Sequence, residues 1–261
     1  MATKIPLTLK TDEDGSAEVL IEARFAGRTY LCLLDTGAAK TTLVWDEFTS
    51  TLPAISENSS HSALGSTTNS VVSIPSFELG PITHTEINVA RLSADHNHPR
   101  NLIGMDILQD WTLTLNLRAG TLFLSDKSLP EAPSLFLGDR GHPYLPVIIG
   151  GQEYDTVWDT GAGLTCVDLS VIREHPDNFE QISDSVGTDS SGESMSTPLY
   201  RLSGLSCGNL QFQPHTVVAL DLARVSASAS RKFLIVLGYS TMKQAVWTLA
   251  FKHRRWTVKE G

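Results

Sequence analysis

The chain has 261 residues, of which 41% are hydrophobic and 19% charged, and its formal net charge is −9. This balance is typical of a globular protein, and it disfavours a nucleic-acid partner, which would need a basic patch. No apolar run approaches the roughly 20 residues that cross a bilayer, so neither a membrane-spanning segment nor a membrane partner is expected.

The three cysteines, Cys32, Cys166 and Cys207, are odd in number and lack the spacing of a metal site. A disulfide framework is therefore not expected, which favours a reducing compartment. The first six residues also lack the apolar stretch of a secretory signal. We expect a cytoplasmic protein, and the alternative is an exported or periplasmic protein whose signal peptide is absent from the sequence.

The first predicted element is a β-hairpin. Residues 17–23 and 29–34 are rich in strand-forming side chains, and Gly27 lies in the turn between them. The second strand ends at the triplet Asp35-Thr36-Gly37. An aspartate at the end of a buried strand projects from a rigid element, and a glycine two residues later lets backbone amides come close to it.

The rest of the first half continues the β pattern. Residues 56–70 are polar and rich in Ser and Thr, and they form either a plain surface loop or a mobile hairpin over a cleft. An apolar pair at 102–103 ends at Gly104 and leads into a short predicted helix. This helix and the strands that follow it are expected at residues 105–109, 111–117 and 121–124.

The second half repeats these elements after a connection rich in Pro and Gly, which we place at residues 129–142. Strands at 145–149 and 154–158 lead to a second triplet, Asp159-Thr160-Gly161. A second apolar pair ends at Gly238. The remaining counterparts are a polar segment at 183–197, a short helix at 241–244, and strands at 247–251 and 255–258.

The two halves align as an internal duplication. With Asp35 placed on Asp159, an offset of 124 residues, both share the frame Gly-x-x-Tyr-x-x-apolar-apolar-Asp-Thr-Gly-Ala-x-x-Thr. The apolar-apolar-Gly blocks align at an offset of 134, as loop insertions in a tandem duplication would produce. Two repeats of this length predict two related lobes, at residues 1–128 and 143–261, rather than a solenoid.

Two aspartates in matched frames indicate paired carboxylates. A single Asp-Thr-Gly would be interpreted as a turn, because Asp and Gly are common turn residues. If a pseudo-twofold axis relates the lobes, Asp35 and Asp159 meet on it, and two carboxylates about 3 Å apart hold one proton between them. The ionised member acts as a general base on water while the protonated member hydrogen-bonds to a substrate carbonyl.

On these motifs the chain resembles the aspartic peptidases, and its lobe size and the alanine after each triplet are most similar to the retropepsin-like branch. The resemblance implies a mostly β fold of two pseudo-twofold-related β-barrel lobes, retropepsin-like or pepsin-like. A peptide or protein substrate would bind in the cleft between them. Both halves lie in one chain, so a monomer suffices, and neither a cofactor nor a metal is implied.

The resemblance also implies a role for each matching residue. The catalytic dyad would be Asp35 and Asp159. The residues that would support the two active loops, the threonines by hydrogen bonds across the axis and the glycines by their amides, are Thr36, Gly37, Thr160 and Gly161. The glycines that would lie beneath the loops are Gly104 and Gly238.

Three features depart from the pepsin-like enzymes. Ala38 and Ala162 replace a Ser or Thr whose hydroxyl would favour the ionised carboxylate, so we expect a less acidic pH optimum than pepsin's, above about pH 3. Residues 56–70 hold no tyrosine, so a flap tyrosine has no evident counterpart. No basic propeptide is evident, so autoactivation from a zymogen is not expected.

The alternative function is a catalytically silent two-lobed module that binds peptides or inhibits another enzyme. Such descendants commonly lose one aspartate, and both are present here. His96 and His98 are too few for a metal site and are expected on a solvated surface. Asp106 and Asp110 are expected to lie on the short helix rather than to bind a metal. The sequence contains neither a phosphate-binding loop nor a Gly-x-Ser-x-Gly elbow.

Overall fold

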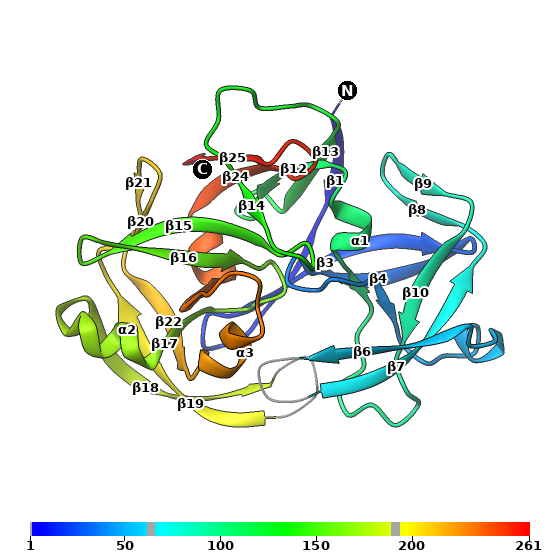
Figure 1. Ribbon diagram of the computed structural model, residues 1–261, viewed down its shortest axis with the longest axis horizontal. Coiled ribbons are helices and arrows are strands. Elements are labelled where there is room, and N and C mark those ends of the chain that lie inside the picture. Colours follow the sequence, from blue (N-terminus) through cyan, green and yellow to red (C-terminus); the bar gives the residue numbers. More distant parts are fainter. Residues whose placement is uncertain (1, 62–65, 189–193) are drawn as a thin grey trace.

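The computed structural model describes residues 2–61, 66–188 and 194–261, and β-strands make up most of them (Figure 1). Two ten-stranded sheets are accompanied by a third sheet of five strands. In the described residues no helix is long and apolar enough to cross a membrane. The predicted mostly β, two-lobed fold is confirmed.

The N-terminal lobe is built on one ten-stranded sheet. Its central strand β4 (Arg28–Leu34) runs parallel to β11 and antiparallel to β3. The remaining path, in spatial order, is β6 (Ser56–His61), β7 (Ser66–Ile74), β10 (Ile87–Arg91), β5 (Thr42–Leu43), β11 (Leu102–Ile103), β4, β3 (Ala17–Phe25), β8 (Phe77–Leu79) and β9 (Ile82–His84), with β2 (Thr8–Thr11) paired to β3.

The C-terminal lobe repeats this sheet strand for strand. Its order is β18 (Phe179–Thr188), β19 (Ser194–Leu202), β22 (His215–Leu220), β17 (Thr165–Asp168), β23 (Ile235–Leu237), β16 (Gln152–Trp158), β15 (Pro143–Ile149), β20 (Ser206–Cys207) and β21 (Leu210–Gln211), with β14 (Phe136–Leu137) paired to β15. Strand β16 therefore takes the place of β4, again between a parallel and an antiparallel neighbour. The duplication in the sequence is a duplication of topology.

The five-stranded sheet joins the two lobes. Its order is β1 (Thr3–Pro6), β13 (Thr121–Ser125), β12 (Thr112–Asn116), β24 (Ala245–Ala250) and β25 (Arg255–Glu260). Strands β12 and β24 are repeat equivalents at an offset of 134 residues, and they pair so that Thr114 lies opposite its own counterpart Thr248. The pseudo-twofold axis passes between these two threonines, because only on the axis does a residue meet its own equivalent.

The helices are short. Helix α1 (Met105–Leu108) falls where a helix was predicted, whereas α4 (Tyr239–Met242) begins two residues before the predicted start, so both helices directly follow the glycine of an apolar-apolar-Gly block. The sequence did not predict the other helical segments, α2 (Leu169–Glu174), α3 (Ala223–Ala227) and the 3₁₀ turns Thr49–Thr51 and Pro176–Asn178. In α2 the Asp168 carboxylate caps the first turn by accepting the Ser170 N–H at 2.8 Å.

The two polar segments are paired strands rather than plain loops. Strands β6 and β7 pair antiparallel over the predicted segment 56–70, and β18 and β19 do so over 183–197. Figure 1 places both hairpins at the lower edge of the molecule in that view. Residues 62–65 and 189–193 within these segments lie outside the described residues.

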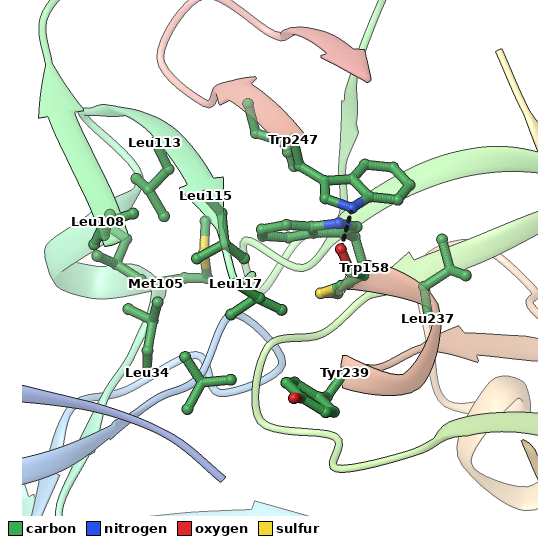
Figure 2. Packing of buried hydrophobic residues seen from close by; sticks show 14 of the residues in the cluster. Leu34, Met105, Leu108, Leu113, Leu115, Leu117, Trp158, Leu237, Tyr239 and Trp247 are labelled. Atoms are coloured by element: carbon green, nitrogen blue, oxygen red, sulfur yellow. Dashed lines mark hydrogen bonds between the residues drawn. The ribbon is translucent and has the colours of Figure 1, made fainter. Parts of the chain in front are cut away.

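The core continues beneath both triplets. Leu34 and Trp158, which directly precede the two aspartates, are fully buried. The rings of Trp158 and Trp247 pack 6.2 Å apart, and the Trp247 indole N–H donates to the Met242 carbonyl at 3.0 Å (Figure 2). The strand ends that carry the aspartates are thereby anchored in the packed centre of the molecule, which fixes the carboxylates more firmly than a surface loop would.

Candidate active site

The two aspartates lie at the ends of equivalent central strands. Asp35 follows β4, and its N–H donates to the Ile103 carbonyl of the neighbouring parallel strand at 3.0 Å. Asp159 follows β16, and its N–H donates to the Leu237 carbonyl at 2.9 Å. Both aspartates are half-buried. Matched backbone bonds therefore hold the two carboxylates at matched places in the two lobes.

The two triplet threonines hold the loops together. The Thr36 N–H donates to the Thr160 hydroxyl at 3.1 Å, and the Thr160 N–H donates to the Thr36 hydroxyl at 3.1 Å. The Thr36 hydroxyl in turn donates to the Trp158 carbonyl at 2.8 Å, and the Thr160 hydroxyl donates to the Leu34 carbonyl at 2.6 Å. Both side chains are fully buried, so this reciprocal network is shielded from water.

Each triplet glycine faces the aspartate of the opposite lobe. The N–H groups of Gly37 and Gly161 donate to Asp159 Oδ1 at 3.1 and 2.8 Å. A methyl group on Gly161 would lie 2.6 Å from Asp35 Cγ, and one on Gly37 would overlap the Asp159 carboxylate. Only glycine leaves this space, so the loops cross closely enough to bring the two carboxylates together.

Gly104 and Gly238 lie directly beneath the two loops. A methyl group on Gly104 would lie 2.9 Å from the Ala38 carbonyl oxygen, and one on Gly238 would lie 2.6 Å from the Ala162 carbonyl oxygen. Their φ angles, −99° and −114°, are ordinary, so close approach of two backbones is the reason for glycine at both positions.

Two segments of the chain, residues 21–107 and 145–241, each match the same family model, described as aspartyl protease. The chain belongs to the aspartyl protease family. Each match contains one Asp-Thr-Gly triplet and one apolar-apolar-Gly block, so the chain carries two aspartyl protease units in tandem. No curated protein matched the chain.

The aspartyl protease geometry perturbs both carboxyl groups. Burial, the charge of Asp159 and a hydrogen bond to Asp159 raise the pKa of Asp35 well above its usual range. Burial also raises the pKa of Asp159, whereas the Gly161 N–H and the hydrogen bond from Asp35 lower it. The two groups titrate as a pair: the two glycine amides favour the ionised form of Asp159, while backbone amides of Ala38 and Gly37 also lower the pKa of Asp35.

His142 is a neighbour of the dyad that the sequence did not reveal. It lies in the predicted connection 129–142 and is half-buried. Burial lowers its pKa, whereas the charge of Asp159 and the backbone of Gly37 raise it. A protonated His142 in turn lowers the pKa of Asp159. No motif marks this residue, because only the fold brings the connection to the active loops.

Asp106 lies on α1, as expected, and it also supports the Asp35 loop, a role that the sequence did not predict. The N–H and the hydroxyl of Thr41 both donate to Asp106 Oδ1 at 2.8 Å. Burial raises the Asp106 pKa and the Thr41 hydrogen bonds lower it. In the second lobe an uncharged group accepts the equivalent hydrogen bond: the Thr165 N–H donates to the Ser240 hydroxyl at 3.0 Å.

Within residues 2–61, 66–188 and 194–261, no cluster of three His, Cys, Asp or Glu side chains is arranged to hold a metal ion. The predicted site residues that the structure brings together are Asp35, Thr36, Gly37, Gly104, Asp159, Thr160, Gly161 and Gly238. The sequence therefore predicted the site residues that belong to the repeated motifs, and it did not predict His142, which lies outside them.

Proposed function

We propose that the chain is an aspartic endopeptidase that hydrolyses peptide bonds with Asp35 and Asp159. The observation that carries this proposal is that one carboxylate oxygen, Asp159 Oδ1, accepts the amide of Gly161 from its own loop and the amide of Gly37 from the opposite loop. Two carboxyls held this close share a proton. Membership of the aspartyl protease family supports peptides as the substrates.

The mechanism follows from the unequal surroundings of the two carboxyls. Asp159, which accepts both amides, is the ionised member and takes a proton from a water held between the two groups. Asp35 carries the shared proton and donates a hydrogen bond to the substrate carbonyl. The water oxygen attacks the carbonyl carbon and gives a tetrahedral gem-diol, and the dyad then protonates the amine as the carbon–nitrogen bond breaks.

One chain supplies both halves of this site, so a monomer suffices. The substrate would lie between the lobes, over the dyad. We place the lobes at residues 1–128 and 143–261, with the connection at 129–142, part of which (β14) pairs with β15. All three cysteines are free thiols, which supports the proposal of a cytoplasmic protein.

The test is cleavage of an unstructured protein from pH 3 to 7 with and without a statine-type transition-state mimic, and with and without a metal chelator. We expect cleavage that the mimic abolishes and the chelator does not change. A folded protein that binds the mimic but cleaves nothing would point to the silent binding module. Cleavage that the chelator abolishes would contradict the proposed dyad chemistry.

A further inference from the structure

A cavity of ≈ 170 Å³ lies beside the strand that carries Asp35. Its floor is apolar and is formed largely by Leu20, Leu31 and Leu33. Leu31 is 48% exposed, which is high for a leucine in a central strand. A cavity of roughly 150 Å³ holds a ring the size of benzene, so this one accommodates one substrate side chain.

The cavity lies on the same face of β4 as Asp35. Side chains alternate along a strand, so Leu31, Leu33 and Asp35 point to one face, while the intervening Cys32 and Leu34 are fully buried on the other. Leu33 precedes Asp35 by about 7 Å of strand, a distance that one or two residues of an extended peptide span. A peptide bound across the dyad therefore passes the mouth of the cavity.

The neighbouring strand β3 also reaches the interlobe boundary at this point. Leu20 on β3 pairs with Leu33. Just ahead of it in the chain, Ala17 contacts the active loop of the other lobe, since a methyl group on Gly163 would lie 3.4 Å from the Ala17 carbonyl oxygen. The cavity is therefore next to the junction of the two active loops and not on a remote face.

The equivalent place in the second lobe is filled. Tyr144 takes the position of Leu20 and pairs with Val157 as Leu20 pairs with Leu33. Phe233 aligns with Pro99 of the cavity wall, and the rings of Tyr144 and Phe233 pack 6.2 Å apart with exposures of 3% and 6%. The pseudo-symmetric fold thus has one open side-chain pocket and one closed one.

A charged group forms the rim of the open pocket. The Arg100 guanidinium contacts the Glu18 carboxylate at 2.6 Å, and Lys10 lies 3.6 Å from the same carboxylate. Arg100 and Glu18 line the cavity with opposite charges, and Lys10, which lies outside the lining, also pairs with Glu18, so two cations offset the Glu18 carboxylate. A guanidinium carries five N–H donors, of which the pair with Glu18 uses only a part. The half-exposed Arg100 is therefore available to an acceptor atom inside the pocket.

We propose that this cavity is a specificity pocket for a substrate side chain with an apolar stem and a hydrogen-bond-accepting tip, as in glutamine or glutamate, and that it disfavours lysine. The stem packs on the three leucines, and the tip accepts from Arg100. The pocket depends on the proposed peptidase function, because it is defined by a peptide that crosses the dyad. Since Tyr144 and Phe233 fill the equivalent place in the second lobe, the preference is confined to one side of the cleaved bond.

The first experiment compares peptides that carry Gln, Met or Lys at a single position within two residues of the cleaved bond. At one position we expect kcat/KM to decrease in the order Gln, Met, Lys, with about a tenfold difference between the first and the last, as one hydrogen bond to a charged donor provides. Equal rates for Gln and Lys at every position, or Met ahead of Gln, would overturn the proposal.

Variants assign the effect to the pocket. Arg100→Met removes the guanidinium and leaves Glu18 on the rim, so the Gln preference should fall and lysine should gain. The matched control is Arg24→Met, because Arg24 on β3 forms an exposed pair with Glu78 on β8 but does not line the cavity. Leu20→Tyr copies the closed pocket and should lower kcat/KM for the Gln peptide more than for an alanine peptide. A Gln preference that survives Arg100→Met would overturn the role of the rim.

Binding separates this proposal from the peptidase proposal. The Asp35→Asn variant should bind the same peptides without cleaving them, and calorimetry should give a Kd about tenfold lower for Gln than for Lys. If this preference is present while the wild type cleaves no peptide, the pocket stands and the peptidase function fails. If the wild type cleaves peptides and the variant binds Gln and Lys peptides equally or not at all, the pocket is refuted and the peptidase function stands.

Discussion

Thr36 and Thr160 each donate a backbone N–H to the hydroxyl of the other at 3.1 Å, across the junction of the two lobes. Each hydroxyl in turn donates a hydrogen bond to the backbone carbonyl of the residue that precedes the opposite aspartate. The four hydrogen bonds join the two strand ends that carry the carboxyl groups. The lobes cannot separate at the dyad without leaving buried polar groups unpaired, which is costly.

The first prediction concerns this network. Thr160→Val keeps the shape of the side chain but leaves the Thr36 amide without its acceptor and the Leu34 carbonyl without its donor. We expect a loss of about 1–3 kcal/mol in the free energy of unfolding and a large loss of kcat, measured by urea unfolding and by peptide cleavage. The control is Thr114→Val, which removes a hydroxyl contact to Thr248 at 3.1 Å in the interlobe sheet. If both variants lose the same activity, the threonines act on stability alone.

The second prediction concerns the residue after each triplet. The backbone N–H of Ala38 lowers the pKa of Asp35, which places Ala38 beside that carboxyl. The double variant Ala38→Ser, Ala162→Ser adds hydroxyl donors that favour the ionised form. The acidic limb of the pH profile of kcat/KM should move down by roughly one pH unit. Ala39→Ser, one residue further on, is the control, and an unmoved limb in the double variant would count against this explanation of the pH optimum.

The third prediction concerns His142. Below its lowered pKa the imidazolium favours the ionised form of Asp159. His142→Gln removes that charge, so the pKa of Asp159 should rise and the acidic limb of kcat/KM should move up by about half a unit or more. His84→Gln, at an exposed position, should leave the profile unchanged. If His142→Gln changes the rate but does not move the acidic limb of the kcat/KM profile, His142 only packs against the active loop.

The fourth prediction concerns stability and pH. The pKa of each dyad carboxyl is raised in the folded state. The corresponding stabilisation is fully present below the unfolded pKa of about 3.9 and is lost as pH rises through the folded pKa. Asp159→Asn cannot titrate, so its thermal midpoint relative to wild type should increase between pH 3.5 and pH 7. A constant difference across that range would contradict the raised pKa values.

The repeat made much of this protein predictable. Because the two triplets and the two apolar-apolar-Gly blocks recur in one order, the sequence indicated two lobes, the central strands β4 and β16, and the contact of Gly104 and Gly238 with the loops. The start of α4 was misplaced by two residues, because Gly238 rather than the later residues sets its first turn.

The rest depended on what the fold brings together. His142 lies in a connection with no periodic pattern, and only packing places it beside Asp159. The link between Thr41 and Asp106 spans 65 residues, and the sequence shows no trace of it. An alignment of the two halves does not predict the open pocket beside Leu33. The strand pairing is needed to show that Tyr144 fills the equivalent place in the second lobe.

The most direct test of the account is to assay Asp35→Asn and Asp159→Asn separately for cleavage of one peptide, with folding checked by circular dichroism. Each amide keeps the size of the side chain and abolishes the shared proton. We expect both variants to stay folded and each to lose kcat by roughly 10²–10⁴-fold. Cleavage at the wild-type rate by either variant would contradict it.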